Sequence, residues 1–277
     1  MLGIVTDSAS DLEPEDVERL GIEVVPLSIR FGDREFIDGV ELTIDQFYAE
    51  LAASDDLPET SAPAPGAFVE AFDRLKARGA TEIVTINLSS ALSATMQSAV
   101  TAAEMVDDID IRVVDSKSIT AGLGTMVINA ATAADDGADA DAIVAMIESQ
   151  RERTHVFGAL DTLDNLKKGG RIGGAQALIG TMLSIKPLLD LSSGAVEEAG
   201  RQRTRKKSMG WLRDKVVEAK GAENLSVMHG NAPDIDDFLT LIESEVDISS
   251  VRIGKIGPVI GTHGGPRVLG IAYLLPE

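Results

Sequence analysis

Residues 87–97 read Asn87-Leu-Ser-Ser-Ala-Leu-Ser-Ala-Thr-Met-Gln97, and the rest of the chain can be organised around this stretch. An apolar run, Ile83 to Ile86, leads into it, and a helix-like run, Ala94 to Glu104, follows. A strand that continues through a hydroxyl-rich turn into a helix can bind an anion, because the first N–H groups of a helix are unpaired and lie at the positive end of its dipole. The simpler interpretation is that Ser90 or Ser93 only caps the helix, and this stretch alone favours capping.

Composition limits the classes of protein that the chain can belong to. With 277 residues it is long enough for two domains, and its net charge of −20 argues against binding to nucleic acid or to anionic membranes. There is no cysteine, and the N-terminus has neither the basic flank nor the apolar core of a signal peptide, so we expect a cytoplasmic protein. The uncharged run from Ile83 to Ala103 contains too many hydroxyl and amide groups to cross a membrane. The strong acidity is also typical of adaptation to high salt.

The first part of the chain alternates between strand-like and helix-like runs. Thr43-Ile44-Asp45-Gln46 is a capping box, and Pro65 suits the first position of a helix. The predicted strands are 3–6, 23–31, 83–86 and 111–114, and the predicted helices are 44–53, 65–79, 94–104, 123–134 and 140–153. Such alternation predicts a parallel sheet with helices on both faces, so we expect residues 1–153 to form one α/β domain.

The second part mixes hairpin signals with helices. The predicted strands are 156–160, 188–191, 196–198, 225–229, 251–256 and 268–275, the predicted helices are 163–168, 204–220 and 233–246, and residues 257–266 are expected to be a loop. Ser192-Ser193-Gly194 is a hairpin turn signal, which favours a mixed sheet in a second domain, 154–277. The uncharged run Ala175 to Ile185 is expected to be a buried core helix or, alternatively, one wall of an apolar pocket.

Several kinds of catalytic or metal site are not supported by motifs. The chain has no Gly-x-x-x-x-Gly-Lys-Ser/Thr phosphate loop and no complete Gly-x-Gly-x-x-Gly. His155, His229 and His263 lie far apart without a ligand spacing, so we expect no metal site. A Ser/His/Asp triad can be assembled on paper from Ser93, His263 and an aspartate, but no Gly-x-Ser-x-Gly turn supports it.

Three further segments carry candidate binding residues. Prolines at 63 and 65 hold Thr60 and Ser61 on a stiff extended segment, which can be a binding element or only a rigid loop. In Gly169-Gly170-Arg171 the glycines allow close approach of the backbone, and the arginine can bind a carboxylate or phosphate; the alternative is a helix C-cap followed by a surface arginine. His263 is either a ligand-binding group or a histidine whose partners are loop backbone.

Taken in order, these motifs resemble the DegV family of bacterial fatty-acid-binding proteins over nearly the whole chain. The resemblance is carried by Thr6-Asp7-Ser8, Thr60-Ser61-Ala62-Pro63, Leu88-Ser89-Ser90-Ala91-Leu92-Ser93-Ala94-Thr95, Val114-Asp115-Ser116, Lys168-Gly169-Gly170-Arg171-Ile172, and Ile256-Gly257-Pro258-Val259-Ile260 with His263. Each motif is weak alone, but their order and spacing are specific.

The resemblance implies a fold and a function. It implies a three-layer parallel α/β domain followed by a two-layer α/β domain with a mixed six-stranded sheet. It also implies that a long-chain fatty acid lies between the domains and is presented to a separate fatty acid kinase, which converts the carboxylate to an acyl phosphate. The chain itself would then be no enzyme and would need no cofactor. The carboxylate-binding positions that it implies are Thr60 or Ser61, Ser93, Arg171 and His263.

Two departures and one basic run qualify this picture. The chain has Ala94-Thr95-Met96 where the family usually has Gly-Thr-Tyr, and Gly265-Pro266-Arg267 where it usually has Gly-Pro-Gly, which puts a cation near the expected site. Arg201 and Arg203 open a basic run that continues to Lys207. This run is either a solvated surface or the place where an acidic kinase surface docks, because complementary charge orients such encounters.

Two other functions remain open from the sequence. The folds of this family and of dihydroxyacetone kinase are related, so the chain can also be a substrate-binding subunit for a small polar substrate. The uncharged run Ala175 to Ile185 favours an apolar ligand tail over a triose. The other possible function is that of a serine hydrolase with Ser93 as nucleophile, but no sequence motif supports it.

Overall fold

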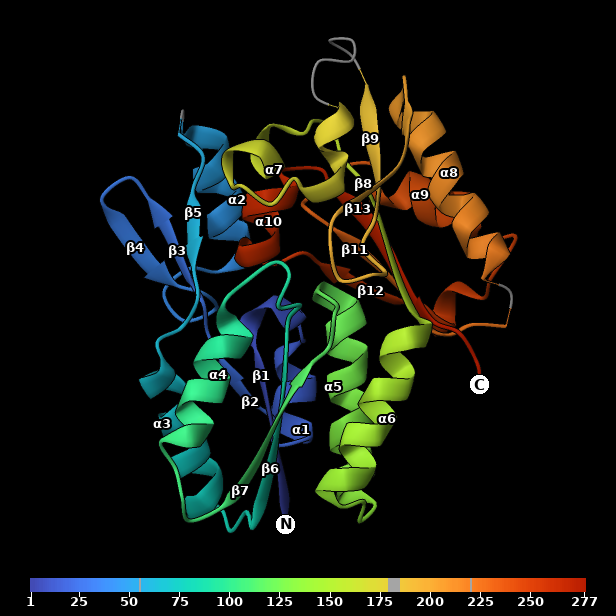
Figure 1. Cartoon of the computed structure of the whole chain (residues 1–277). Helices are drawn as coiled ribbons and strands as arrows, with labels where there is room; N and C mark the ends of the chain where they lie inside the picture. The colour runs from blue at the N-terminus through green and yellow to red at the C-terminus, as the bar shows by residue number, and fades with distance from the viewer. Residues whose placement is uncertain (55, 179–184, 220) are drawn as a thin grey trace.

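A four-stranded parallel sheet forms the centre of the first half of the chain (Figure 1). The computed structural model describes residues 1–54, 56–178, 185–219 and 221–277. The order of the sheet is β2-β1-β6-β7, formed by β1 (Leu2–Asp7), β2 (Glu23–Val25), β6 (Glu82–Asn87) and β7 (Asp110–Asp115). All three pairings are parallel, so the carboxyl ends of the strands lie at one edge, where the residues after β1 and β6 meet.

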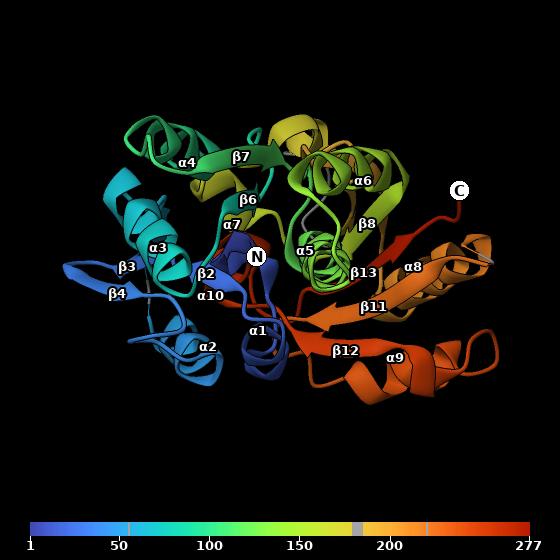
Figure 2. The same cartoon turned by 90° about the horizontal axis from the view of Figure 1, so that it is seen from below.

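Helices cover both faces of this sheet, as Figure 2 shows from below. Val5 and Ile83 pack with the buried side chains of one pair of helices, whereas Ile4 and Val84 face the other pair. This alternation follows from the period of two along a strand. The first pair is α3 (Pro65–Ala77) and α4 (Thr95–Glu104), and the second is α5 (Thr120–Asp135) and α6 (Ala140–Arg153). The predicted three-layer parallel arrangement is confirmed.

A small antiparallel sheet, in the order β4-β3-β5, extends from the first half. It contains β3 (Ser28–Phe31), β4 (Arg34–Ile37) and β5 (Glu59–Ser61). The prediction of one strand over 23–31 is therefore wrong: the chain leaves the parallel sheet after β2 and enters a different sheet at β3. Pro26 lies between them, and a proline has no N–H to donate to a sheet ladder. The capping box at the start of α2 (Ile44–Ala53) is present as predicted.

The second half forms a mixed six-stranded sheet in the order β10-β9-β8-β13-β11-β12. Among the described residues of this sheet, β11 and β12 pair in parallel and the other neighbours pair antiparallel. The strands are β8 (Thr154–Ala159), β9 (Lys186–Asp190), β10 (Glu197–Gln202), β11 (Glu223–His229), β12 (Arg252–Lys255) and β13 (Leu269–Leu274). One face packs against α8 (Arg205–Glu218) and α9 (Ile235–Ile242), and side chains on the other face join the core of the first half. The predicted mixed sheet is thus also confirmed.

Of two further predictions for the second half, the loop at 257–266 is wrong, and the helix at 175–185 lies partly outside the described residues. Residues 257–266 are largely a helix, α10 (Pro258–Gly264), because Pro258 suits the first helical position and Gly265, with φ of 78°, ends the helix in a conformation that glycine adopts readily. Of the run 175–185, residues up to 178 belong to a 3-10 helix, η2 (Gly173–Leu178), and residues 179–184 lie outside the described part.

The remaining short helices are α1 (Pro14–Arg19), α7 (Asp164–Lys168), η1 (Ser8–Ser10) and η3 (Ile248–Ser250). No helix among the described residues is long and apolar enough to cross a membrane. The predicted domain boundary between residues 153 and 154 falls between α6 and β8, and the division into independent domains stays a prediction.

Candidate ligand-binding site

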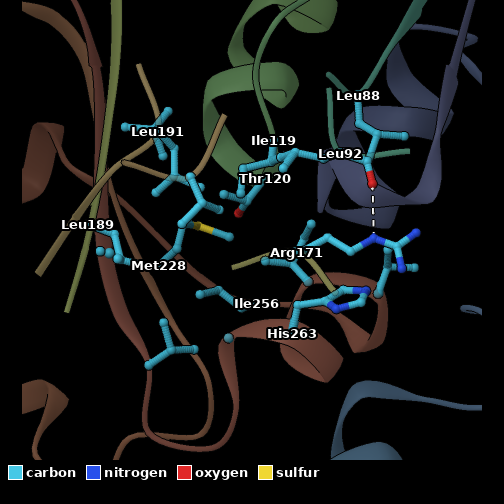
Figure 3. A pocket seen from close by; sticks show the side chains of 18 of the residues that line it. Leu88, Leu92, Ile119, Thr120, Arg171, Leu189, Leu191, Met228, Ile256 and His263 are labelled. Carbon is cyan, nitrogen blue, oxygen red and sulfur yellow. Dashed lines mark hydrogen bonds between the residues drawn. The ribbon is translucent and has the colours of Figure 1, made fainter. Parts of the chain in front are cut away.

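An apolar cavity lies where the two halves of the molecule meet (Figure 3). It encloses about 960 Å³ of space free of protein atoms, the solvent at its mouth included. Its lining comes from both halves and is mostly aliphatic, with Leu88 and Ile119 from the first half and Leu189, Met228 and Ile256 from the second. The polar side chains among the described lining residues are Thr60, Ser93, Thr120, Arg171 and His263.

A buried carboxylate, that of Asp7, binds the start of the loop that carries Ser93. Asp7, at the end of β1, accepts hydrogen bonds from the side chain of Asn87 at 3.1 Å and from the backbone N–H of Leu88 at 2.9 Å. Complete burial raises the pKa of Asp7 to about 6, although these bonds and one from the N–H of Ala9 act in the opposite direction. Asp7 therefore bonds nearby backbone rather than facing the cavity, and it fixes the start of the serine loop.

Ser93 itself lies at the beginning of α4 and lines the cavity. Its Oγ accepts a hydrogen bond from the N–H of Thr95 at 3.3 Å and lies 2.9 Å from Thr95 Oγ1. Ser90 bonds instead to Asp115, away from the cavity lining. Ser93 thus satisfies a helix N-terminus and still borders the cavity, so the two interpretations of this serine are compatible.

The extended segment β5 presents Thr60 and Ser61 on opposite sides. Thr60 lines the cavity, as does Ala62 two residues further on, whereas Ser61 is exposed and is not among the lining residues. This follows from the alternation of side chains along a strand. Thr60 Oγ1 lies 2.9 Å from Nε2 of His263, which comes from α10 in the other half of the molecule. Of the two alternatives at this position, only Thr60 reaches the cavity.

His263 is neutral at physiological pH. Its burial and, next, the positive charge of Arg171 lower its pKa from 6.5 to about 4. Nδ1 is buried without a hydrogen-bond partner among the described residues, and it sits so close to Gly169 that a Cβ there would lie 2.3 Å away. Gly169 also ends α7 with an N–H bond to Asn165 O. The first glycine of the Gly-Gly-Arg motif therefore caps a helix and makes room for the histidine ring.

Arg171 brings a positive charge to the same end of the cavity. Nε donates to the carbonyl of Leu92 at 3.2 Å, and Nη1 donates to the carbonyl of Gly169 at 2.7 Å, as Figure 3 shows for the first bond. Among the described residues Arg171 makes no ion pair with a carboxylate. A partly buried guanidinium without an acidic partner is suited to bind an anion through its remaining donors.

The group formed by Thr60, Ser93, Arg171 and His263, here called the head site, carries one positive charge at neutral pH. It opens onto an aliphatic cavity, so the arrangement suits a monoanion with an apolar tail. The ring of His263 bonds Thr60, and the hydroxyl of Ser93 bonds Thr95, so these two residues do not form the hydrogen-bonded pair of a serine hydrolase.

The other predicted basic residues lie outside the cavity lining. Arg267 has φ of 63°, the left-handed conformation that suits the glycine usual in the family, and its side chain extends to Asp161 at 3.5 Å and Asp234 at 3.7 Å. Arg201 and Arg203 are exposed and, in the part of the chain that is described, make no ion pair. No group of three potential metal ligands occurs among the described residues.

Sequence reasoning missed Thr120. It is the first residue of α5 and follows the turn after β7, so it lies at the same carboxyl edge of the parallel sheet as Asp7 and Ser93. Its position after a strand of the parallel sheet could have identified Thr120 from the sequence, because ligand-facing residues of α/β sheets gather at this edge.

Comparison with known proteins places the chain among relatives of full length. A family profile described as uncharacterised protein, DegV family, matches residues 1–275. A DegV domain-containing protein of Halalkalibacterium halodurans is 36% identical over 282 residues, which cover 100% of this chain and 99% of the relative. A second one, from Listeria innocua, is 33% identical over 98% of each chain.

Solved structures show the same fold. A DegV family protein from Thermus thermophilus, described by its fatty acid binding, has a TM-score of 0.89 at 33% identity, with 99% of each chain covered. DegV from Bacillus subtilis, described as a fatty acid binding protein, has a TM-score of 0.89 at 29% identity over 99% of each chain. A protein from Eubacterium ventriosum, described as binding stearic acid, has a TM-score of 0.89 at 26% identity, covering 99% of this chain and 98% of the other.

Proposed function

This chain belongs to the DegV family, and we propose that it binds a long-chain fatty acid in the cavity between its halves, with the carboxylate at the head site. The observation that carries this proposal is that Arg171, which has no carboxylate partner among the described residues, lies in an otherwise mostly aliphatic cavity. A triose, the ligand of the alternative function, would leave these aliphatic walls without a contact. Full-length relatives that are described as fatty-acid binders support the same choice.

The neutral state of His263 determines how the head site would hold a carboxylate. A neutral imidazole has one N–H, and if Nε2 carries it, the ring donates to Thr60 Oγ1. The hydroxyl hydrogen of Thr60 is then free for the ligand. Arg171 and Ser93 complete the set of donors, and Arg171 supplies the compensating charge. The protein needs no catalytic residue for this role, and the ligand is its only bound small molecule.

The test is the identity of the molecule that the protein carries. Protein purified from its native host is extracted with organic solvent, and the extract is analysed by mass spectrometry. We expect a fatty acid in near-stoichiometric amount. Protein freed of lipid should then bind C16 and C18 acids in calorimetry but not dihydroxyacetone. If the lipid-free protein binds no long-chain acid, the proposed function is wrong.

The second part of the proposal concerns the fate of the ligand. The chain presents the carboxylate to a separate fatty acid kinase in the cytoplasm, and exposed Arg201 and Arg203 at the end of β10 dock that partner. We assign the docking role to Arg201 and Arg203 because both are exposed and make no ion pair in the described structure, although the molecule carries a net charge of −20. Neighbouring Arg205, in contrast, is paired with Asp234 at 2.9 Å.

Replacing Arg201→Glu together with Arg203→Glu should abolish phosphorylation of the bound acid by the cognate kinase and leave the lipid affinity unchanged. A control of the same charge change replaces Arg74→Glu at the end of α3 and Arg78→Glu just after it, two arginines that pair with Glu23, and should keep most of the phosphorylation rate if the variant stays folded by circular dichroism. If the first double variant is phosphorylated at the wild-type rate at low salt, β10 is not the docking surface.

A further inference from the structure

One hydroxyl group in the cavity, outside the head site, has hydrogen-bonding capacity that no other residue of the cavity lining uses. Thr120 lines the cavity, is only 5% exposed, and its Oγ1 is buried without a hydrogen-bond partner among the described residues. In Figure 3 Thr120 lies between Arg171 on one side and Leu189 and Leu191 on the other. Buried hydroxyl groups are normally paired, because leaving one unpaired costs free energy. The hydroxyl of Thr120 has one donor and two acceptor sites, so it can still pair with a polar group in this part of the cavity.

The backbone at Thr120 is held in an unusual conformation. Its φ is 44°, in the left-handed region, where a β-branched residue is rarely found. Such strain occurs where the surrounding structure fixes a residue in place, often at binding sites. Thr120 is also the first residue of the 16-residue helix α5, whose N-cap, Ile119, makes no side-chain cap bond. The positive end of the helix dipole at Thr120 favours an oxygen acceptor near its hydroxyl.

The buried carboxyl group of Asp11 lies next to Thr120. Asp11 Oδ1 accepts a hydrogen bond from the N–H of Gly257 at 3.1 Å, while Oδ2 is buried without a partner that meets hydrogen-bond geometry. Burial raises the pKa of Asp11 well above its usual range, and hydrogen bonding with the hydroxyl of Thr120 acts in the opposite direction, so the two groups lie next to each other. Asp11 lines a small neighbouring pocket rather than the cavity, so Thr120 stands between the carboxyl group and the cavity.

We propose that Thr120, backed by Asp11, is a second polar subsite that recognises a hydroxyl group carried partway along the acyl chain of the ligand. This rests on the proposed fatty-acid binding. A hydroxyl group both donates and accepts, so it fits Thr120 in either state of Asp11. With a charged Asp11, Thr120 donates to the carboxylate and accepts from the ligand; with a neutral Asp11, it accepts from the acid and donates to the ligand.

Other substituents fit less well. An unsubstituted saturated chain leaves the Thr120 hydroxyl with no partner other than Asp11. A carbonyl oxygen can only accept, so it fits one of the two states of Asp11. A second carboxylate would meet the charge of Asp11 in its ionised state. The ligand class that the subsite selects is therefore a long-chain hydroxy fatty acid with its hydroxyl at a position that reaches Thr120 when the carboxylate occupies the head site.

The experiment compares octadecanoic acid with a series of hydroxyoctadecanoic acids in which the hydroxyl group moves along the chain. Affinities for lipid-free wild-type protein are measured by competition calorimetry. We expect one isomer, or two adjacent ones, to bind roughly three- to tenfold more tightly than octadecanoic acid, as for one net hydrogen bond, and the other isomers to bind more weakly. If no isomer binds more tightly than octadecanoic acid, the proposal is wrong.

Two variants at Thr120 complete the test. Thr120→Val keeps the branched shape and should lose the preference for the favoured isomer, while its affinity for octadecanoic acid stays within about twofold. Thr120→Ser keeps the hydroxyl and should keep the preference. A preference that survives Thr120→Val would overturn the proposal. Binding of octadecanoic acid distinguishes the two hypotheses. If wild-type protein does not bind it, the proposed fatty-acid binding is wrong; if it does bind but no isomer is preferred, only the subsite is wrong. The wild-type series stands on its own if a variant does not fold.

Discussion

At the end of the cavity that contains the head site the contacts are few and directional, whereas the walls towards the six-stranded sheet are made by many aliphatic side chains. Thr60 and His263 meet across the two halves of the molecule, and Arg171 reaches back to the loop of Ser93 through the carbonyl of Leu92. The walls have no such network: Leu189, Met228 and Ile256 contribute surface rather than specific bonds.

This difference predicts two kinds of response to mutation. Removing one member of the head site takes one hydrogen bond or the compensating charge away from a buried carboxylate, so the loss of binding free energy is large and discrete. Removing methyl or methylene groups from the walls changes the free energy of binding in steps of about 0.8 kcal/mol for each buried methylene group. The following predictions test this contrast, beginning with the largest expected effect.

Arg171→Met should weaken fatty-acid binding most, by about a hundredfold or more, because it removes the positive charge that compensates the carboxylate while it keeps an unbranched apolar side chain as long as arginine up to Nε. Calorimetry with a C16 or C18 acid measures the effect. Arg201→Met removes the same charge at an exposed site and serves as the control, with less than about a twofold change. Equal losses in the two variants would mean that only the overall charge of the protein matters.

Ser93→Ala should weaken binding by roughly ten- to a hundredfold, since a hydrogen bond to a charged group contributes about 1.5–3 kcal/mol. Ser61→Ala, at the exposed neighbour of Thr60, should leave the affinity nearly unchanged. Circular dichroism should show that both variants keep the fold. Unchanged affinity in Ser93→Ala would reduce this serine to a group that only supports the start of α4.

The head site also carries a pH dependence that the aliphatic walls lack. The pKa of His263 is about 4 in the folded protein and 6.5 in the unfolded chain, so the unfolded state binds more protons between these values. The contribution of His263 to stability is therefore complete above pH 6.5 and falls as the pH decreases towards 4. Between pH 7 and 5 the free energy of unfolding of the lipid-free wild type should fall by about 1–2 kcal/mol more than that of His263→Gln. Parallel stability profiles from urea unfolding would contradict the buried neutral state of His263.

Met228→Ala should change the preferred length of the acyl chain. Met228 lines the cavity and also the small pocket behind it, which contains Leu12 and Ala121, so a shorter side chain joins the two spaces. The preference for longer acids should rise by up to about fourfold for each additional methylene group, in a series from C14 to C20. An unchanged order of affinities would show that the acyl chain ends before it reaches Met228.

Much of the local structure follows from the sequence alone. The capping box at Thr43, Pro65 at the start of α3 and the alternation of strands and helices up to Arg153 all describe interactions between residues close in the chain, and each is present in the structure. Such features can be predicted because hydrogen bonding and φ preferences within a few residues determine them.

The site depended on contacts that no local pattern contains. Whether Thr60 or Ser61 reaches the cavity is decided by the face of β5 that turns to α10, and the room for His263 is decided by Gly169, which is 94 positions away in the chain. Sequence by itself determined the class of fold, the apolar and acidic character of the chain and the residue types that bind an anion. Only the tertiary structure brought Thr60, Ser93, Arg171 and His263 to one end of a cavity and placed Thr120, next to Asp11, in its lining. Burial and charge at each of these groups arise from the meeting of the two halves.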